Sequence, residues 1–166
     1  MKLIHKLVLG TVTAVLTALP AVAAPKTSLD LLQTVERGGI DVVVNTPRCA
    51  EKPVLGLYTF VGMKRQLTLC PGPSIDPHDH RTVRHEVWHA IQHCVNTARG
   101  TDVRMPVNMD VDDFVKDVNT YLSEERVSAI KRLYPRDHWP VELEAAMAEE
   151  LSNELLIEAF TQACIF

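Results

Sequence analysis

The chain has 166 residues, of which 46% are hydrophobic and 23% charged, and its formal net charge at pH 7 is -4. These values are typical of one globular domain and exclude a disordered, collagen-like or multi-domain chain. Acidic side chains outnumber basic ones, 21 against 17, so the composition also argues against nucleic-acid binding.

The first 23 residues have the three-part organisation of a secretory signal peptide. Two lysines precede an uncharged apolar run over residues 7–19, and small residues at 21–23 resemble a cleavage site. The apolar run is shorter than the roughly 20 residues that a membrane-spanning helix needs. We therefore expect cleavage after Ala23, a secreted or periplasmic location, and no stable membrane anchor; the alternative is an uncleaved anchor. The mature domain, residues 24–166, would carry a net charge of -6 because both lysines are lost.

The mature domain is expected to begin with a helix and a small antiparallel sheet and to continue with helices, which is an α+β arrangement. Apolar spacing, caps and turn residues define these elements. In chain order they are a helix over Ser28–Arg37 capped by Ser28, strands over Ile40–Val44, Leu55–Phe60 and Gln66–Cys70, and helices over Arg81–Asn96, Asp110–Tyr121, Ser123–Leu133 and Val141–Phe160.

The second and third strands are expected to form an antiparallel hairpin. A three-residue turn over 61–63 would place Leu57 opposite Leu67 and give the hairpin one aliphatic face. Cysteine pairing is a separate question, because four cysteines in an exported chain favour two disulfides but allow three connectivities. Cys49 with Cys70 is plausible from the hairpin.

The complementary bridge, Cys94 with Cys164, sets a condition on the last helix. One straight helix over residues 141–164 would carry Cys164 about 33 Å from its start, whereas Cys94 lies only about 8 Å beyond His89. This pairing therefore requires a break in the helix, for which Ser152-Asn153 is the best place.

The helix expected over Arg81–Asn96 contains His85-Glu86-Val87-Trp88-His89, which is the HExxH pattern. Side chains four residues apart lie on one face of a helix, about 6 Å apart, so both imidazoles can bind one zinc ion. Glu86 can then accept a proton from a water that the metal acidifies. The alternative is a surface helix with two solvated histidines, but an apolar stripe accompanies the motif and predicts that the helix packs into a core; it consists of Val83, Val87, Ala90 and Ile91.

His93 extends the row of histidines by one more turn. Eight residues of helix span about 12 Å, so His85 and His93 cannot share one ion. We expect His93 either to pack in the core or to contact one of the residues that bind the metal. A metzincin is excluded by spacing, because Gln92 and Val95 stand where that class needs glycine and histidine. The third ligand must come from elsewhere in the chain.

The start of the last helix, residues 140–148, supplies the candidate. Here the chain resembles the gluzincin group of zinc metallopeptidases, in which HExxH is followed downstream by a helix that carries a glutamate ligand in an ExxA context. The resemblance implies a minimal zincin-like fold with Glu142 as the third ligand and Ala145 as the small residue three positions later. Glu144 is the alternative, but Met147, one turn after it, would obstruct close packing against the motif helix.

One departure from the gluzincin pattern concerns the groups that orient the ligands. Ala146 stands where several such families have Asp or Asn, so an orienting group must come from elsewhere or be absent. The later acidic residues of this helix are interpreted as surface glutamates: Glu149, Glu150, Glu154 and Glu158.

Other polar groups offer less specific signals. The loop at Asp76–His80 could cap the motif helix or orient a ligand, although solvated side chains are the simpler interpretation. Tyr121, Tyr134 and His138 are candidate donors to a transition-state oxyanion, and the sequence does not select among them.

The sequence predicts an exported zinc metallopeptidase that acts on a peptide or protein substrate. Zn2+ would be bound by His85, His89 and Glu142, and Glu86 would be the general base. One alternative is a secreted binding or inhibitory protein that keeps the metal site without turnover. Another is a disulfide-stabilised protein with no metal.

Overall fold

The computed structural model describes residues 25–51, 54–62, 64–70, 80–102, 105–108 and 110–165. The expected signal peptide and the candidate residues 76–79 lie outside this part of the chain. The described helices are α1 (Ser28–Arg37), α2 (Pro47–Glu51), α3 (His80–Arg99), α4 (Val111–Tyr121), α5 (Glu124–Leu133), α6 (Trp139–Ala148) and α7 (Asn153–Cys164), with a 3-10 turn η1 (Arg136–His138). The strands are β1 (Asp41–Val44), β2 (Gly56–Val61) and β3 (Lys64–Leu69). The prediction of an α+β fold is confirmed.

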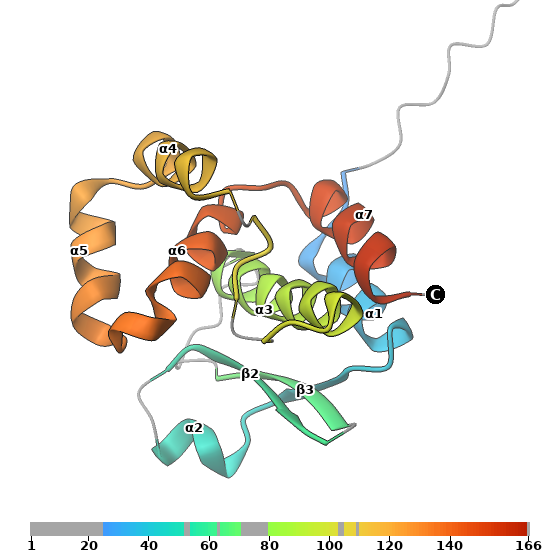
Figure 1. Cartoon of the computed structure of the whole chain (residues 1–166). Helices are drawn as coiled ribbons and strands as arrows, with labels where there is room; N and C mark the ends of the chain where they lie inside the picture. The colour runs from blue at the N-terminus through green and yellow to red at the C-terminus, as the bar shows by residue number, and fades with distance from the viewer. Residues whose placement is uncertain are drawn as a thin grey trace, which may run out of the picture.

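The three strands form one mixed sheet in the order β1-β3-β2. The antiparallel β2-β3 hairpin is confirmed, but β1 runs parallel to β3, so the expectation of a purely antiparallel sheet is wrong. The chain passes from β1 through the short helix α2 before it enters β2 (Figure 1). This excursion lets β1 align with the second strand of the hairpin instead of the first.

The hairpin register differs by one residue from the prediction. Tyr58, not Leu57, lies opposite Leu67. The reason is the turn: Val61 pairs directly with Lys64, which leaves a two-residue connection that begins at Gly62 with φ 59°. A two-residue hairpin turn favours such positive φ values. Because a one-residue shift exchanges the two faces of a strand, Tyr58 turns toward α3.

Helix α3 lies at the centre of the molecule. The sheet packs on one side of it, α1 and α7 on a second side, and the α4-α5-α6 group on a third (Figure 1). The main core joins the sheet, α1, α3 and α7, and Leu31, Leu67 and Phe160 are completely buried in it. A smaller core joins α4, α5 and α6 through Val118, Ile130, Leu143 and Ala146. Helix α6 therefore links the second core to α3.

The expected last helix, Val141–Phe160, is divided in two. α6 ends at Ala148, and α7 begins at Asn153 with Ser152 as its N-cap, whose hydroxyl accepts from the Leu155 amide. The break predicted at Ser152-Asn153 is thus present. It allows the Cys94–Cys164 disulfide to form beside a Cys49–Cys70 disulfide, each with Cα atoms 5.3 Å apart.

The helix starts follow the expected capping chemistry with one correction. Ser123 caps α5 as predicted, but α1 is capped by Thr27 instead of Ser28. Thr27 forms a reciprocal capping box with Asp30. A capping box satisfies two backbone donors, which a cap at Ser28 would not do here.

Two disulfides suggest an oxidising, extracellular environment for the protein. In the part of the chain that the structure describes, no helix combines the length and the apolar character needed to cross a membrane.

Candidate metal centre

Three predicted ligand residues meet between α3 and α6. His85 and His89 come from successive turns of α3, and Glu142 comes from the first turn of α6. Glu142 Oε2 lies 3.3 Å from His85 Nε2 and 3.7 Å from His89 Nε2, and the two Nε2 atoms are 3.2 Å apart. The structure therefore brings these side chains together, and the group can hold a metal ion.

The spacing of the three donor atoms fits a tetrahedral ion. With ligand distances of about 2.0 to 2.1 Å, a tetrahedral geometry places neighbouring donors about 3.3 Å apart. All three observed separations lie close to that value. Glu142 Oε2 is also buried and has no hydrogen-bond partner of adequate geometry among the described residues. A buried carboxylate oxygen without such a partner is costly unless a cation satisfies it.

Each imidazole is oriented through its other nitrogen. His85 Nδ1 lies 3.0 Å from Glu149 Oε1, and Glu149 is in turn paired with Arg126 from α5. Because a carboxylate accepts and does not donate, Nδ1 carries the proton and Nε2 is the nitrogen left for a metal. A carboxylate on the far nitrogen is the usual way in which proteins orient a histidine ligand.

Gln92 orients the imidazole of His89 through a hydrogen bond to its Nδ1 atom. Its Oε1 lies 2.8 Å from His89 Nδ1, while its Nε2 donates to the Val141 carbonyl and to the Glu144 carboxylate. Those two acceptors fix the amide orientation, so Oε1 must accept from Nδ1–H. His89 Nε2 is therefore also directed at the cluster with its lone pair.

In the metal-free protein the same groups hold a proton. Burial alone lowers the pKa of His85, but hydrogen bonds to Glu142 and Glu149 and the charges of nearby glutamates raise it to about 9. Burial alone raises the pKa of Glu142, but its contacts with the two histidines lower it to about 2. A cation and a proton thus compete for the same buried negative charge.

Glu86 lies beside the cluster and is 6% exposed. Burial raises the pKa of its carboxyl group, while the neighbouring histidines act in the opposite direction. Gly56 of β2 makes this placement possible, because a Cβ atom there would lie 2.5 Å from Glu86 Cγ. The hairpin thus approaches the motif helix at a residue without a side chain, directly over Glu86.

The cluster opens into a cavity of about 380 Å3 between β2, α3 and α6. Of the three candidate donors, Tyr134 and His138 line this cavity, and Tyr121 does not. Burial raises the pKa of the Tyr134 hydroxyl to about 12, and the charges of the Glu142 and Glu86 carboxylates act in the same direction. The tyrosine is therefore a neutral donor.

His93 is a packed histidine, one of the two roles expected for it. Its ring stands edge-on to Phe60 and Tyr58 of β2, with centroid separations of 4.4 and 5.8 Å. It lines the wall of the cavity, away from the ligand cluster. Burial lowers the pKa of His93, so the ring is favoured in its neutral form.

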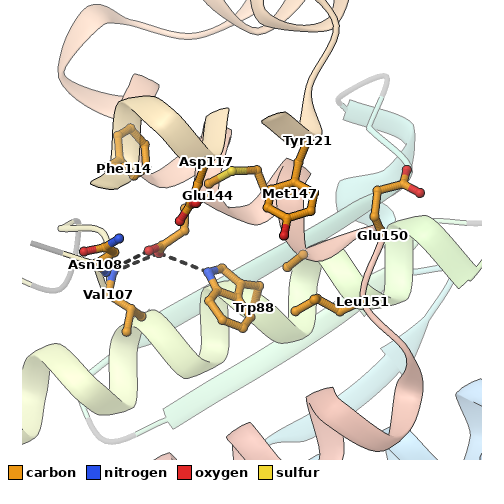
Figure 2. A pocket seen from close by; sticks show the side chains of 11 residues that line it. Trp88, Val107, Asn108, Phe114, Asp117, Tyr121, Glu144, Met147, Glu150 and Leu151 are labelled. Atoms are coloured by element: carbon orange, nitrogen blue, oxygen red, sulfur yellow. Dashed lines mark hydrogen bonds between the residues drawn. The ribbon is translucent and has the colours of Figure 1, made fainter. Parts of the chain in front are cut away.

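Glu144, the alternative ligand, lies on the other side of α6. Its carboxylate accepts four hydrogen bonds, from Trp88 Nε1, Gln92 Nε2 and the backbone amides of Val107 and Asn108. Figure 2 shows those from Trp88, Val107 and Asn108. These contacts are within 2.8 to 3.0 Å. The structure therefore gives Glu144 a packing role and leaves Glu142 as the carboxylate that faces the imidazoles.

Sequence reasoning missed both orienting residues. Glu149 was interpreted as a surface glutamate, but it is only 6% exposed and supplies the carboxylate that Ala146 cannot. A signal was present, since Glu149 stands seven residues after Glu142 and thus on the same helical face. Gln92 stands three residues after His89, also a same-face spacing on α3.

Comparisons of the chain with models of protein families, with curated proteins and with solved structures each gave no match. The interpretation of the site therefore depends on its geometry.

Proposed function

We propose that the protein is an exported zinc metallopeptidase of the gluzincin type. The observation that supports it is the tetrahedral spacing of His85, His89 and Glu142, with Glu86 buried beside them. Two histidines, one glutamate and a free fourth position are the ligand set of catalytic zinc sites. The two disulfides are consistent with export.

A zinc ion held by these residues supplies a Lewis acid and an acidified water. With zinc held there, Glu86 would accept the water proton and pass it to the departing amine. Its burial favours this role, because a carboxylate with a raised pKa holds a proton more readily at neutral pH. Gly56 keeps space for the Glu86 side chain at this position.

Tyr134 and His138 are the proposed donors to the oxyanion that develops on the substrate carbonyl. Both line the cavity that contains the ligand cluster. The Tyr134 hydroxyl keeps its proton over the physiological range because its pKa is about 12. A positioned neutral donor of this kind stabilises developing negative charge.

Strand β2 is the proposed guide for the substrate backbone. It is an edge strand, because β3 is its only neighbour in the described sheet. Leu57, Tyr58 and Phe60 of this strand line the cavity beside the ligands. An extended peptide added to this edge would place its carbonyl groups over the cluster.

The test is peptide hydrolysis by the exported protein, loaded with zinc, against a broad peptide mixture analysed by mass spectrometry. Glu86→Gln should keep about one zinc per chain and lose about 10²–10⁴-fold in rate, because only the proton transfer is removed. Glu150→Gln, an exposed neighbour of the site, is the matched control and should retain the rate.

Two results would contradict the proposal. A zinc-loaded wild-type protein that cleaves nothing in the mixture would favour the non-catalytic binding protein. An undiminished rate in the Glu86→Gln protein would exclude Glu86 as the general base.

A further inference from the structure

A second cavity, of about 360 Å3, lies between α3, α4 and α6. It shares no lining residue with the cavity of the metal cluster. Trp88 of α3 forms its floor. Met147 of α6 and Leu151 of the loop after α6 line one side (Figure 2). The volume is within the range of small-molecule sites.

Most of the hydrogen-bonding capacity of Glu144 in this cavity is already used. Both carboxylate oxygens are occupied, Oε2 by Trp88, Gln92 and the Val107 amide, and Oε1 by the Asn108 amide. The Trp88 indole N–H is used in the same network. The floor therefore presents the face of an indole ring and aliphatic groups to a ligand.

The opposite wall comes from one face of α4. Phe114, Asp117 and Tyr121 follow each other at spacings of three and four residues, so they point to the same side. Figure 2 shows Asp117 between the two rings. Asp117 is half-buried and has no hydrogen-bond or ion-pair partner among the described residues. Glu150, also on the lining, is paired with Arg81 at 3.1 Å.

The cavity thus combines three aromatic rings with one carboxylate that has no partner among the described residues. Ring faces attract cations, and the attraction increases where the cation loses water. A carboxylate beside the rings adds Coulomb attraction and repels anions. A purely apolar ligand would leave Asp117 half-buried without compensation, whereas a cation would satisfy it.

We propose that this cavity is a binding site for a small organic cation, an alkyl- or arylammonium with an apolar body. The apolar body contacts Trp88, Met147 and Leu151, and the ammonium group lies between Asp117 and the Tyr121 ring. This site is separate from the metal cluster and does not depend on the proposed peptidase activity.

The probe is benzyltrimethylammonium, because a quaternary ammonium has no lone pair with which to bind a metal. Benzyl alcohol and phenylacetate are the neutral and anionic comparisons. Binding to the exported protein is measured by calorimetry and by the NMR signals of the indole N–H groups. The chain has two tryptophans, so Trp139→Phe identifies the Trp88 signal.

The expected result is saturable binding of the cation with a shift of the Trp88 signal. Benzyl alcohol should bind at least about fivefold more weakly, and phenylacetate should not bind measurably. Asp117→Asn should remove most of the preference for the cation over the alcohol. Asp112→Asn, the same change on an exposed turn of the same helix, should leave it unchanged.

A second pair of variants isolates the contribution of the Tyr121 ring to cation binding. Tyr121 is 61% exposed, so its replacement should not prevent folding. Tyr121→Phe should bind the cation as well as the wild type does, and Tyr121→Leu should bind it at least about threefold more weakly.

The proposal is overturned if no binding of the cation is detected up to a concentration of about 10 mM. It is equally overturned if the alcohol binds as tightly, or if Asp117→Asn changes nothing.

Discussion

Two glutamates two residues apart on α6 have nearly equal burial and opposite surroundings. Glu142 is 7% exposed and Glu144 is 5% exposed. Glu144 accepts four N–H donors, whereas one oxygen of Glu142 has no proper hydrogen bond and faces two imidazole nitrogens. Burial alone therefore does not separate a structural carboxylate from a candidate metal ligand, whereas unmet hydrogen-bonding capacity does.

The first prediction uses stability to separate the two glutamates. Glu144→Ala should lower the free energy of unfolding of the metal-free protein by about 3 kcal/mol or more, because four buried N–H donors lose their acceptor. Glu142→Ala should cost distinctly less above about pH 9, since His85 is then neutral and no amide depends on Glu142. Urea denaturation in the presence of a chelator measures both values, and equal losses would contradict the distinction.

A second prediction concerns the neighbouring pair Glu149 and Glu150. Glu149→Ala should weaken metal binding by about 10–100-fold, because His85 loses the acceptor that orients its ring. Glu150→Ala removes the same charge one position later and should change the affinity by less than about twofold. Competition with a zinc chelator gives both constants. If the two variants behave alike, Glu149 contributes charge and not orientation.

A third, smaller effect is the dependence of metal binding on pH. The pKa of His85 in the metal-free protein is about 9, so below that pH a metal must displace one proton. The apparent zinc affinity should therefore rise about tenfold per pH unit between pH 7 and 8.5 and level off above about 9. Chelator competition at several pH values measures it, and an affinity that is constant over this range would contradict a protonated His85.

The parts of the site that follow local rules could be predicted from the sequence. His85 and His89 share a face because a helix repeats every 3.6 residues, and the small Ala145 indicated that Glu142 could approach α3. Ala145 is completely buried, as close packing requires. Glu149 was harder to identify, because its same-face spacing has meaning only once Glu142 is known as the ligand, and nothing local indicates its pairing with Arg126 from α5.

The errors in the fold have nonlocal or single-residue causes. The parallel pairing of β1 with β3 depends on where α2 returns the chain, which no local pattern records. The hairpin register depends on whether the turn has two or three residues, and a single glycine is compatible with both. The break before Asn153 could be predicted only because the Cys94–Cys164 bridge required it.

Glu142, not Glu144, is proposed to complete a zinc site with His85 and His89. The most direct test is the zinc content of the purified protein after dialysis against zinc-free buffer, measured for the wild type and for both alanine variants. The account predicts about one zinc per chain for the wild type and for folded Glu144→Ala, and almost none for Glu142→Ala. A wild-type protein without zinc after zinc-replete refolding, or a Glu142→Ala protein that keeps it, would contradict the account.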